Sequence, residues 1–230
     1  MATFNPRPDR FDAYLQALQT RVPFALSRWG DGEWQCLLGH QGANCDGQPY
    51  TLALRRDLIA VLRDRPRYDL GLQGFALQRL GDAIAAWLDR EGMDVSWVDA
   101  DSLARRSRDG RLAPFVYALA ARDVVLVGPA YLRMLALFPV VAHVEVPARA
   151  VHEDVLERLV RETAAAIAAW PEAVVAISAG MSANVVVHRL HASSPAATLL
   201  DCGSLWEPYV GRVTRTYHRA VMAARAQAPA

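Results

Sequence analysis

The sequence predicts an α/β fold: a Rossmann-like, mainly parallel sheet with helices on both faces. The first observation is a series of short, continuous apolar runs bounded by charges, glycine or proline, as in parallel strands buried on both faces. The second is that segments with helical spacing of apolar residues separate these runs. The third is that 230 residues with 53% hydrophobic content allow one domain with a sizeable core.

The predicted elements alternate along the chain. The predicted strands are 22–26, 68–72, 95–98, 123–129, 142–146, 173–178 and 197–201. The predicted helices are 9–18, 34–38, 52–63, 77–90, 101–121, 131–137, 152–170 and 182–192. We expect a single domain over 1–230 with flexible ends at 1–8 and 221–230, and an irregular polar segment at 202–217. The glycine-rich segment 40–49 is predicted to be a loop that could close over a ligand.

Composition excludes several classes of protein. The 25 basic and 24 acidic residues give a net charge of +1, so no global field attracts nucleic acid or an anionic membrane. Three scattered cysteines, Cys36, Cys45 and Cys202, do not make a disulfide framework or a zinc site, and the odd number suits a reducing compartment. The sequence shows neither an apolar signal core nor a membrane-length apolar stretch. We therefore expect a soluble, cytoplasmic protein.

Two carboxylates, Asp31 and Glu33, follow the first predicted strand, where Gly-Asp-Gly opens it into a turn. The flanking glycines are expected to take positive φ and allow close approach of a ligand. Hard oxygen donors at this spacing, with Arg28 just upstream, suit a divalent metal that bridges a diphosphate. The alternative is that Asp-Gly is only a good turn and Glu33 only the first charge of the next helix.

A turn of small residues, Ser178 to Asn184, connects a buried strand to a helix. Its free N–H groups and the helix dipole favour phosphate, with Ser178 and Ser182 as additional donors. The alternative is an ordinary strand-to-helix turn in which Ser182 is the N-cap. The turn matches neither a Walker A loop nor a Gly-x-Gly-x-x-Gly motif.

The last third of the chain adds polar residues to the same predicted edge of the sheet. Asp201 ends a strand and Ser204 lies in the turn after it, where ligands bind in open α/β sheets. The basic and aromatic segment 211–219 suits a cover over an anionic ligand, or a solvated tail. A second basic patch, Arg105 to Arg108, is more typical of a solvated helix end than of a site for a polyanion.

Together, segments 28–33, 178–183 and 201–204 resemble the GT-D-fold glycosyltransferases, bacterial and phage nucleotide-sugar enzymes with a Rossmann-like architecture. The resemblance extends from about residue 20 to about residue 219, with the three motifs in the right order. It implies metal-assisted transfer of a sugar from a nucleoside diphosphate, UDP above all, to an acceptor hydroxyl. In that family the Asp-x-Glu pair, here Asp31 and Glu33, serves Mn²⁺ or Mg²⁺ and the nucleotide.

The resemblance also implies roles for individual residues. The implied catalytic residues are Asp31, Glu33 and Glu207, with Glu207 as general base toward the acceptor or, alternatively, a surface glutamate before Pro208. The residues implied to bind the nucleotide sugar are Arg28, Trp29, Gly30, Ser178, Gly180, Ser182, Asp201, Gly203, Ser204, Arg215 and Tyr217. The acceptor is left open among a glycan, a glycoprotein and a modified phage DNA base.

Two other classes of function remain at this stage. A metal-dependent phosphohydrolase or nucleotidyltransferase needs similar acidic and phosphate-binding parts. A non-catalytic nucleotide- or nucleic-acid-binding module would instead use the basic clusters 105–108 and 212–219. Neither the sugar, the stereochemical outcome nor the oligomeric state follows from these residues.

Overall fold

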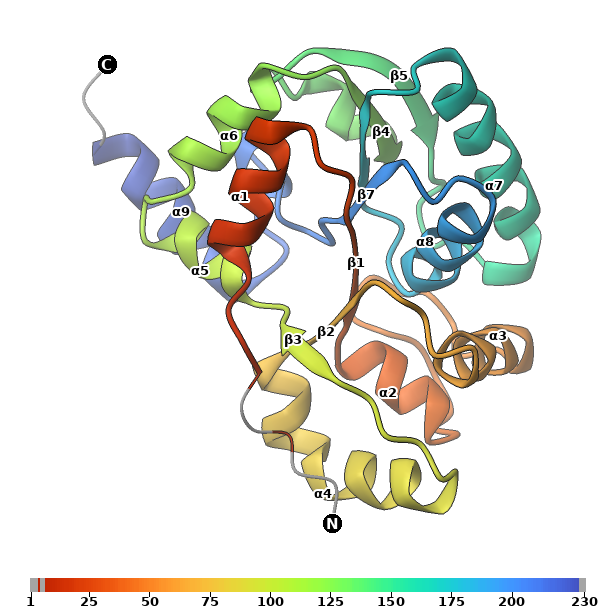
Figure 1. Cartoon of the computed structure of the whole chain (residues 1–230). Coiled ribbons are helices and arrows are strands. Elements are labelled where there is room, and N and C mark those ends of the chain that lie inside the picture. The colour runs from red at the N-terminus through yellow and green to blue at the C-terminus, as the bar shows by residue number, and fades with distance from the viewer. Residues whose placement is uncertain (1–3, 5–6, 228–230) are drawn as a thin grey trace.

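The computed structural model describes residue 4 and residues 7–227, and a parallel seven-stranded sheet runs through it (Figure 1). The strands are β1 Ala25–Trp29, β2 Asp69–Leu72, β3 Trp97–Asp99, β4 Val124–Gly128, β5 Val140–Glu145, β6 Val174–Ile177 and β7 Thr198–Asp201. Their order in the sheet is β3-β2-β1-β7-β6-β4-β5, and every recorded strand pair is parallel. The predicted α/β class with helices on both faces is confirmed.

Helices cover both faces of this sheet (Figure 1). They are α1 Phe11–Thr20, α2 Asp31–Leu37, α3 Leu52–Arg63, α4 Gly74–Arg90, α5 Ser102–Arg108, α6 Ala113–Ala120, α7 His152–Ala169, α8 Ser182–Ser193 and α9 Thr216–Gln227, with short 3-10 helices η1 Ala130–Met134 and η2 Glu207–Val210. Alternate strand residues enter opposite cores. Val125 belongs to the core that contains buried residues of α2, α3, α4, α7 and α8, whereas Leu126 belongs to the core that contains those of α1 and α6.

Four tryptophans pack together in the core beside the turn after β1. The rings of Trp29, Trp34, Trp87 and Trp97 have neighbouring centroids 5.9–6.1 Å apart. Trp29 is fully buried and donates its indole N–H to Ser27 Oγ at 3.1 Å. Trp29 was expected to bind the nucleotide sugar; the structure instead buries it fully in the core, with its ring against those of Trp34 and Trp97.

Several element boundaries differ from the sequence prediction. The first strand begins at Ala25 and reaches Trp29, later than the predicted 22–26, and the helix after it begins at Asp31. The predicted helix 101–121 is two helices, because Gly110 has φ +69° between them. Residues 216–227 form helix α9, which corrects both the irregular end at 216–217 and the flexible end expected at 221–227. Residues 1–3, 5–6 and 228–230 of the expected flexible ends lie outside the described residues.

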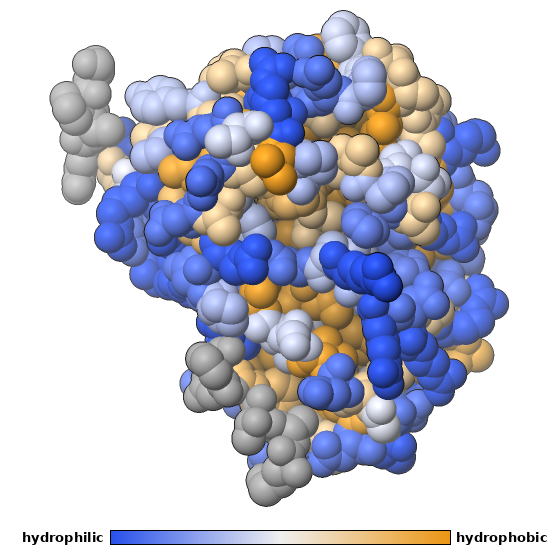
Figure 2. Space-filling model, viewed as in Figure 1, coloured by the Kyte–Doolittle hydropathy of each residue, from blue (hydrophilic) through white to orange (hydrophobic). Residues whose placement is uncertain are grey.

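Hydrophilic side chains cover most of the face shown in Figure 2, with apolar ones in smaller areas between them. Among the described residues, no helix combines the length and apolar character that a membrane crossing requires.

The sheet topology determines where a ligand would bind. The chain continues from β1 to β2, toward the β3 edge of the sheet, but from β4 to β5, toward the opposite edge. The direction of the connections therefore reverses within the sheet. In open parallel sheets, ligands bind beyond the carboxyl ends of the strands at such a reversal. The relevant turns are therefore those that follow β1, β7, β6 and β4.

Candidate functional site

The turns after β1 and β7 are joined to helix α8 by direct hydrogen bonds. Arg28 donates its backbone N–H to Asp201 Oδ2 at 2.9 Å and its Nη1 to the Cys202 carbonyl at 3.0 Å. Asn184, on the first turn of α8, donates its side-chain Nδ2 to the Arg28 carbonyl at 3.1 Å. Residues from three distant parts of the chain thus form one cluster. We call this strand-end region the crevice, after the place where ligands bind in open α/β sheets.

Glu33 is the internal member of the acidic pair. Its Oε2 accepts the backbone N–H of Gly30 at 2.9 Å, which caps helix α2, and its Oε1 lies 3.5 Å from Asn184 Nδ2. Burial raises the pKa of Glu33 to about 7, and the carboxylates of Asp201 and Asp31 add to the rise. Glu33 is therefore a buried residue that fixes the start of helix α2 beside the crevice.

Asp31 is the accessible member of the pair. Its side chain is 31% exposed, and Oδ2 accepts Nη1 of Arg79 at 3.3 Å. The Arg79 guanidinium also lies over the exposed ring of Phe75, 5.2 Å from its centroid.

The described residues include no group of three or more His, Cys, Asp or Glu placed to hold a metal. A Mg²⁺-type ion shared with a diphosphate needs only one or two protein carboxylates, because phosphate and water complete its shell. Asp31 suits that role as it stands. Glu33 is less suited to it, because its carboxylate is buried and Oε2 already accepts the Gly30 N–H.

The glycines beside Asp31 serve packing rather than an unusual backbone conformation, which corrects the expectation of positive φ. Gly30 is extended, with φ −106°, and Gly32 lies inside helix α2. A Cβ on Gly30 would meet the Gln73 side chain at 2.5 Å. A Cβ on Gly32 would lie 3.2 Å from Asn44 and 3.3 Å from Met181, so this glycine lets the 40–50 loop and the turn after β6 approach α2.

The turn after β6 has the predicted position at the start of α8, but another side chain caps it. The backbone N–H of Met181 donates to Gln48 Oε1 at 3.1 Å, and Gln48 Nε2 donates to the Ala179 carbonyl at 3.4 Å. Gly180 has φ +57°, and a Cβ there would overlap Gln48. The predicted phosphate turn is thus covered by the loop.

Ser182 belongs to a buried chain of hydrogen bonds. Its Oγ lies 3.0 Å from His152 Nδ1, and His152 Nε2 lies 3.1 Å from Asp57 Oδ2. Ser182 and His152 are almost completely buried, so the chain connects α8 to α7 and α3 from inside the protein. Two polar atoms beside the same turn, Ser178 Oγ and Asn184 Oδ1, are buried and make no hydrogen bond in the described structure.

The turn after β7 brings its predicted residues together. Gly203, with φ +51°, donates its N–H to Asp201 Oδ1 at 3.0 Å, and Arg28 fills the space where a Cβ would lie. Burial raises the pKa of Asp201 to about 6, against the opposing effect of Arg28. Ser204 Oγ lies 3.3 Å from the hydroxyl of Tyr217, at the start of α9.

Glu207 lies at the start of η2 and is 8% exposed. The Tyr131 hydroxyl donates to its Oε1 at 2.8 Å, and the Thr214 hydroxyl donates to its Oε2. Tyr131 follows β4, and the Arg212 guanidinium lies 4.1 Å from its ring centroid. The Glu207 carboxylate is therefore held rigidly beside the turn after β4, and it is not a free surface glutamate.

Arg215 connects the end of the chain to the loop over the crevice. Its Nη2 donates to Asp46 Oδ2 at 2.6 Å, and its Nη1 lies 3.2 Å from the Thr214 carbonyl. The predicted role of segment 211–219 as a cover is consistent with this position. The sequence assigned no role to Asp46.

The other basic patch is largely neutralised by carboxylates. Arg105 pairs with Asp99 at 2.5 Å, Arg106 pairs with Asp9 at 2.8 Å, and Arg108 pairs with Asp109 at 2.9 Å. These contacts favour the solvated helix end over a site for a polyanion.

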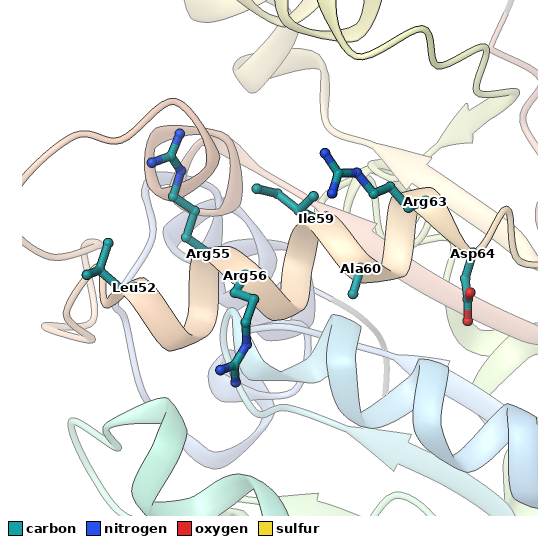
Figure 3. A pocket seen from close by; sticks show the side chains of 7 residues that line it. All are labelled: Leu52, Arg55, Arg56, Ile59, Ala60, Arg63 and Asp64. Carbon is teal, nitrogen blue, oxygen red and sulfur yellow. The ribbon is translucent and has the colours of Figure 1, made fainter.

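A surface hollow of about 500 Å³ lies elsewhere, along the outer side of α3 (Figure 3). It is lined by Leu52, Arg55, Arg56, Ile59, Ala60, Arg63 and Asp64. Each of its three arginines already donates to a carbonyl or carboxylate: Arg55 to Leu37, Arg56 to Asp57 and Arg63 to Glu91. Because no strand end contributes to this hollow, the crevice is the stronger candidate for a functional site.

The residues of the crevice that sequence reasoning missed include Asn184, Gln48, Arg79 and Tyr131. Asn184 had a usable signal, since it lies two residues after Ser182 in the turn already singled out. Gln48, Arg79 and Tyr131 had none, because a loop, the middle of a helix and a short 3-10 helix supply them.

Comparison with family models finds no match, and comparison with curated proteins finds none. Solved structures do match. A protein described as "A New Glycosyltransferase (DUF1792) from Streptococcus sanguinis" superposes with a TM-score of 0.63 at 16% identity, covering 86% of this chain and 81% of that one. A second structure, described as the highly conserved domain of unknown function 1792 with "a distinct glycosyltransferase fold", gives a TM-score of 0.60 at 17% identity over 85% and 77% of the two chains. The chain therefore has the fold of these glycosyltransferase-fold proteins.

Proposed function

We propose that the protein is a glycosyltransferase of the GT-D type that moves a sugar from a nucleoside diphosphate, UDP in the first instance, to an acceptor hydroxyl. The observation that carries the proposal is the position of an accessible carboxylate, Asp31, at the strand-end crevice that also holds the α8 N-terminus. The shared fold supports it. The same crevice would serve the phosphohydrolase alternative, so reaction products must distinguish the two.

The chemistry follows from the leaving group. Departure of a nucleoside diphosphate builds negative charge on phosphate oxygens, and groups that meet this charge lower the barrier. The N–H groups of the α8 turn and the Arg215 guanidinium are the groups that we assign to it. Asp31 is the residue that would hold Mn²⁺ or Mg²⁺, and the bound ion would neutralise part of the diphosphate charge.

Glu207 is the residue that we propose as general base toward the acceptor. A carboxylate has about four lone-pair positions, and the Tyr131 and Thr214 hydroxyls use one on each oxygen. Capacity therefore remains for an acceptor hydroxyl. The two neighbours hold the carboxylate in one orientation, which a proton transfer in the transition state requires.

The test begins with a thermal-shift panel of UDP, GDP, ADP and CMP, each with Mn²⁺, Mg²⁺ or EDTA. A ligand that binds only the folded state stabilises it by about 2.7 kcal/mol at a hundredfold excess over Kd. We expect a metal-dependent shift with UDP that Asp31→Ala loses. The matched control is Asp12→Ala, because Asp12 is an exposed carboxylate on α1, which packs on the opposite face of the sheet from α2.

Turnover of UDP-sugars completes the test. Asp31→Ala should reduce turnover at least a hundredfold, the scale of losing one charge-stabilising group at a transition state. Retention of full turnover by Asp31→Ala and Glu33→Ala would overturn the proposal. Release of nucleoside monophosphate and sugar 1-phosphate, whether or not an acceptor is added, would indicate the phosphohydrolase instead, because that enzyme hydrolyses the diphosphate and leaves the bond to the sugar intact.

A further inference from the structure

Residues 40–50, which we call the strap, pack between the turns after β1 and β6. The side chains of Asn44 and Met181 both lie against the place where Gly32 lacks a side chain. Asn44 Oδ1 accepts the backbone N–H groups of Asp46 and Gln48 at 3.0 and 2.9 Å, so its side chain organises the strap internally. The strap is therefore an ordered cover on the crevice.

The Gln48 carboxamide occupies the start of α8. Its Oε1 accepts the Met181 N–H and lies 3.2 Å from Asn44 Nδ2, and the side chain is almost completely buried. A carboxamide oxygen that accepts a helix N-terminal N–H takes the place that a phosphate oxygen would take. The buried Ser178 Oγ and Asn184 Oδ1, which lack partners, show that hydrogen-bonding capacity beside this turn is unused.

Asp46 likewise provides a partner for the nearby guanidinium of Arg215. Its carboxylate pairs with Arg215 at 2.6 Å, although both side chains are partly exposed, at 39% and 25%. The strap thus satisfies one backbone donor and one guanidinium, the two kinds of group that bind diphosphate elsewhere. A single loop thus supplies both the carboxamide and the carboxylate that take the places of phosphate oxygens.

The strap has the features of a segment that can move away. Residues 41–43 and 45–47 are exposed. Gly42 and Gly47 have φ +113° and +77°, conformations that glycine adopts at little cost. It is attached to the crevice by Gln48, by the Asp46 to Arg215 ion pair and by Asn44 against α2. At its end the Tyr50 hydroxyl also donates to Gln35 of α2 at 2.8 Å.

We propose that the strap is an autoinhibitory contact: in the free protein Gln48 and Asp46 occupy the Met181 N–H and Arg215, and an incoming diphosphate displaces both. The inference rests on the proposed function in placing the donor diphosphate at this turn. Opening also removes the Asp46 charge from the path of an anion. The diphosphate must compete with the strap, so the strap lowers the apparent affinity of the free protein.

The experiment is calorimetric titration of the full chain with inorganic pyrophosphate, and separately with UDP and Mn²⁺. The variants are Gln48→Ala, Asp46→Asn and the control Gln19→Ala, which removes an exposed glutamine of α1. Gln48→Ala should bind pyrophosphate about tenfold more tightly, which corresponds to about 1.4 kcal/mol. Asp46→Asn should bind it severalfold more tightly, and Gln19→Ala should match the wild type.

Hydrogen exchange of the same samples provides a readout that does not depend on affinity. Pyrophosphate should accelerate exchange in peptides covering 40–50 of the wild type and slow exchange of the amides at 179–183. Equal or weaker binding by Gln48→Ala and Asp46→Asn, or no pyrophosphate binding by any variant, would overturn the strap proposal. Asp46→Asn alters an exposed residue, so it keeps the test decisive if Gln48→Ala folds poorly.

The two proposals fail in different ways. If UDP binds with metal and every variant has the wild-type Kd, the transferase proposal stands and the strap proposal is rejected. If the variants bind pyrophosphate more tightly and the strap exchanges faster, yet no sugar donor is turned over, the strap proposal stands and the transferase proposal is rejected.

Discussion

The turns after β1 and β6 lie side by side and are capped in opposite ways. The β1 turn is capped locally, because Glu33 accepts the N–H of Gly30 three residues earlier. The β6 turn is capped by Gln48, which lies 133 residues before Met181 in the chain. A local cap forms with its helix and stays with it, whereas a cap from a distant loop can leave without unfolding the helix. We therefore expect the β1 turn to be structural scaffold and the β6 turn to be the adjustable part of the crevice.

The largest expected effect comes from removing the local cap. Glu33→Ala leaves the Gly30 N–H buried without an acceptor, so the free energy of unfolding should fall by about 2–4 kcal/mol. Glu33→Gln retains an acceptor oxygen and should lose clearly less. Denaturant titration of both variants measures the difference. Equal losses would show that the cap contributes little and would remove the contrast between the turns.

The next effect tests the distant cap. Gly180→Ala puts a Cβ where Gln48 Oε1 lies and also strains a residue with φ +57°, so we expect a loss of about 2 kcal/mol. Gly211→Ala is the matched control, because Gly211 has φ +79° with open space around it. It should lose only about 1 kcal/mol. Amide hydrogen exchange of the strap should accelerate in Gly180→Ala and not in Gly211→Ala. An unchanged exchange rate in Gly180→Ala would mean that the Gln48 side chain shifts while the strap stays in place.

A smaller effect depends on pH and concerns the segment that carries Arg215. The Thr214 and Arg215 N–H groups point at His218 Nδ1, at 3.2 and 3.3 Å, and burial lowers the pKa of His218 below its usual 6.5. Below pH 6.5 the unfolded chain then binds a proton that the folded chain resists. Stability from this group is complete above pH 6.5 and is lost as the pH falls toward the lowered pKa.

The variant His218→Asn keeps an acceptor oxygen near the position of Nδ1 but cannot be protonated. We therefore expect it to lose less stability than the wild type between pH 6.5 and pH 5 in thermal unfolding. Parallel pH profiles for the two proteins would contradict the assignment.

The smallest stability effect belongs to the accessible carboxylate. Asp31→Ala removes only a partly exposed pair with Arg79, so the free energy of unfolding should change by less than about 0.5 kcal/mol. Its effect on UDP-sugar turnover should nevertheless be the largest of any variant described above. A large loss of stability in Asp31→Ala would mean that Asp31, like Glu33, belongs to the scaffold.

Much of this protein follows from the sequence by itself. The buried runs that became β4 and β6 and the helical spacing that became α3 and α7 predicted an alternating, parallel α/β fold. These are local patterns of apolar residues: a strand that is buried on both faces of a parallel sheet is a continuous apolar run in the sequence. The same reasoning directed attention to the turns after β1, β6 and β7, because ligand sites in such sheets follow strand ends.

Only the tertiary structure decided what individual residues do. Asp31 and Glu33 are two residues apart, yet one is accessible and the other caps a buried N–H, since the start of α2 at Asp31 turns them toward different surroundings. Trp29 was predicted to contact the nucleotide sugar but lies fully buried in the core, where its ring packs against those of Trp34 and Trp97. Gln48 carried no signal, since its partners in the turn after β6 lie more than 130 residues away. Contacts over such separations depend on sheet order and helix packing, which no local pattern encodes.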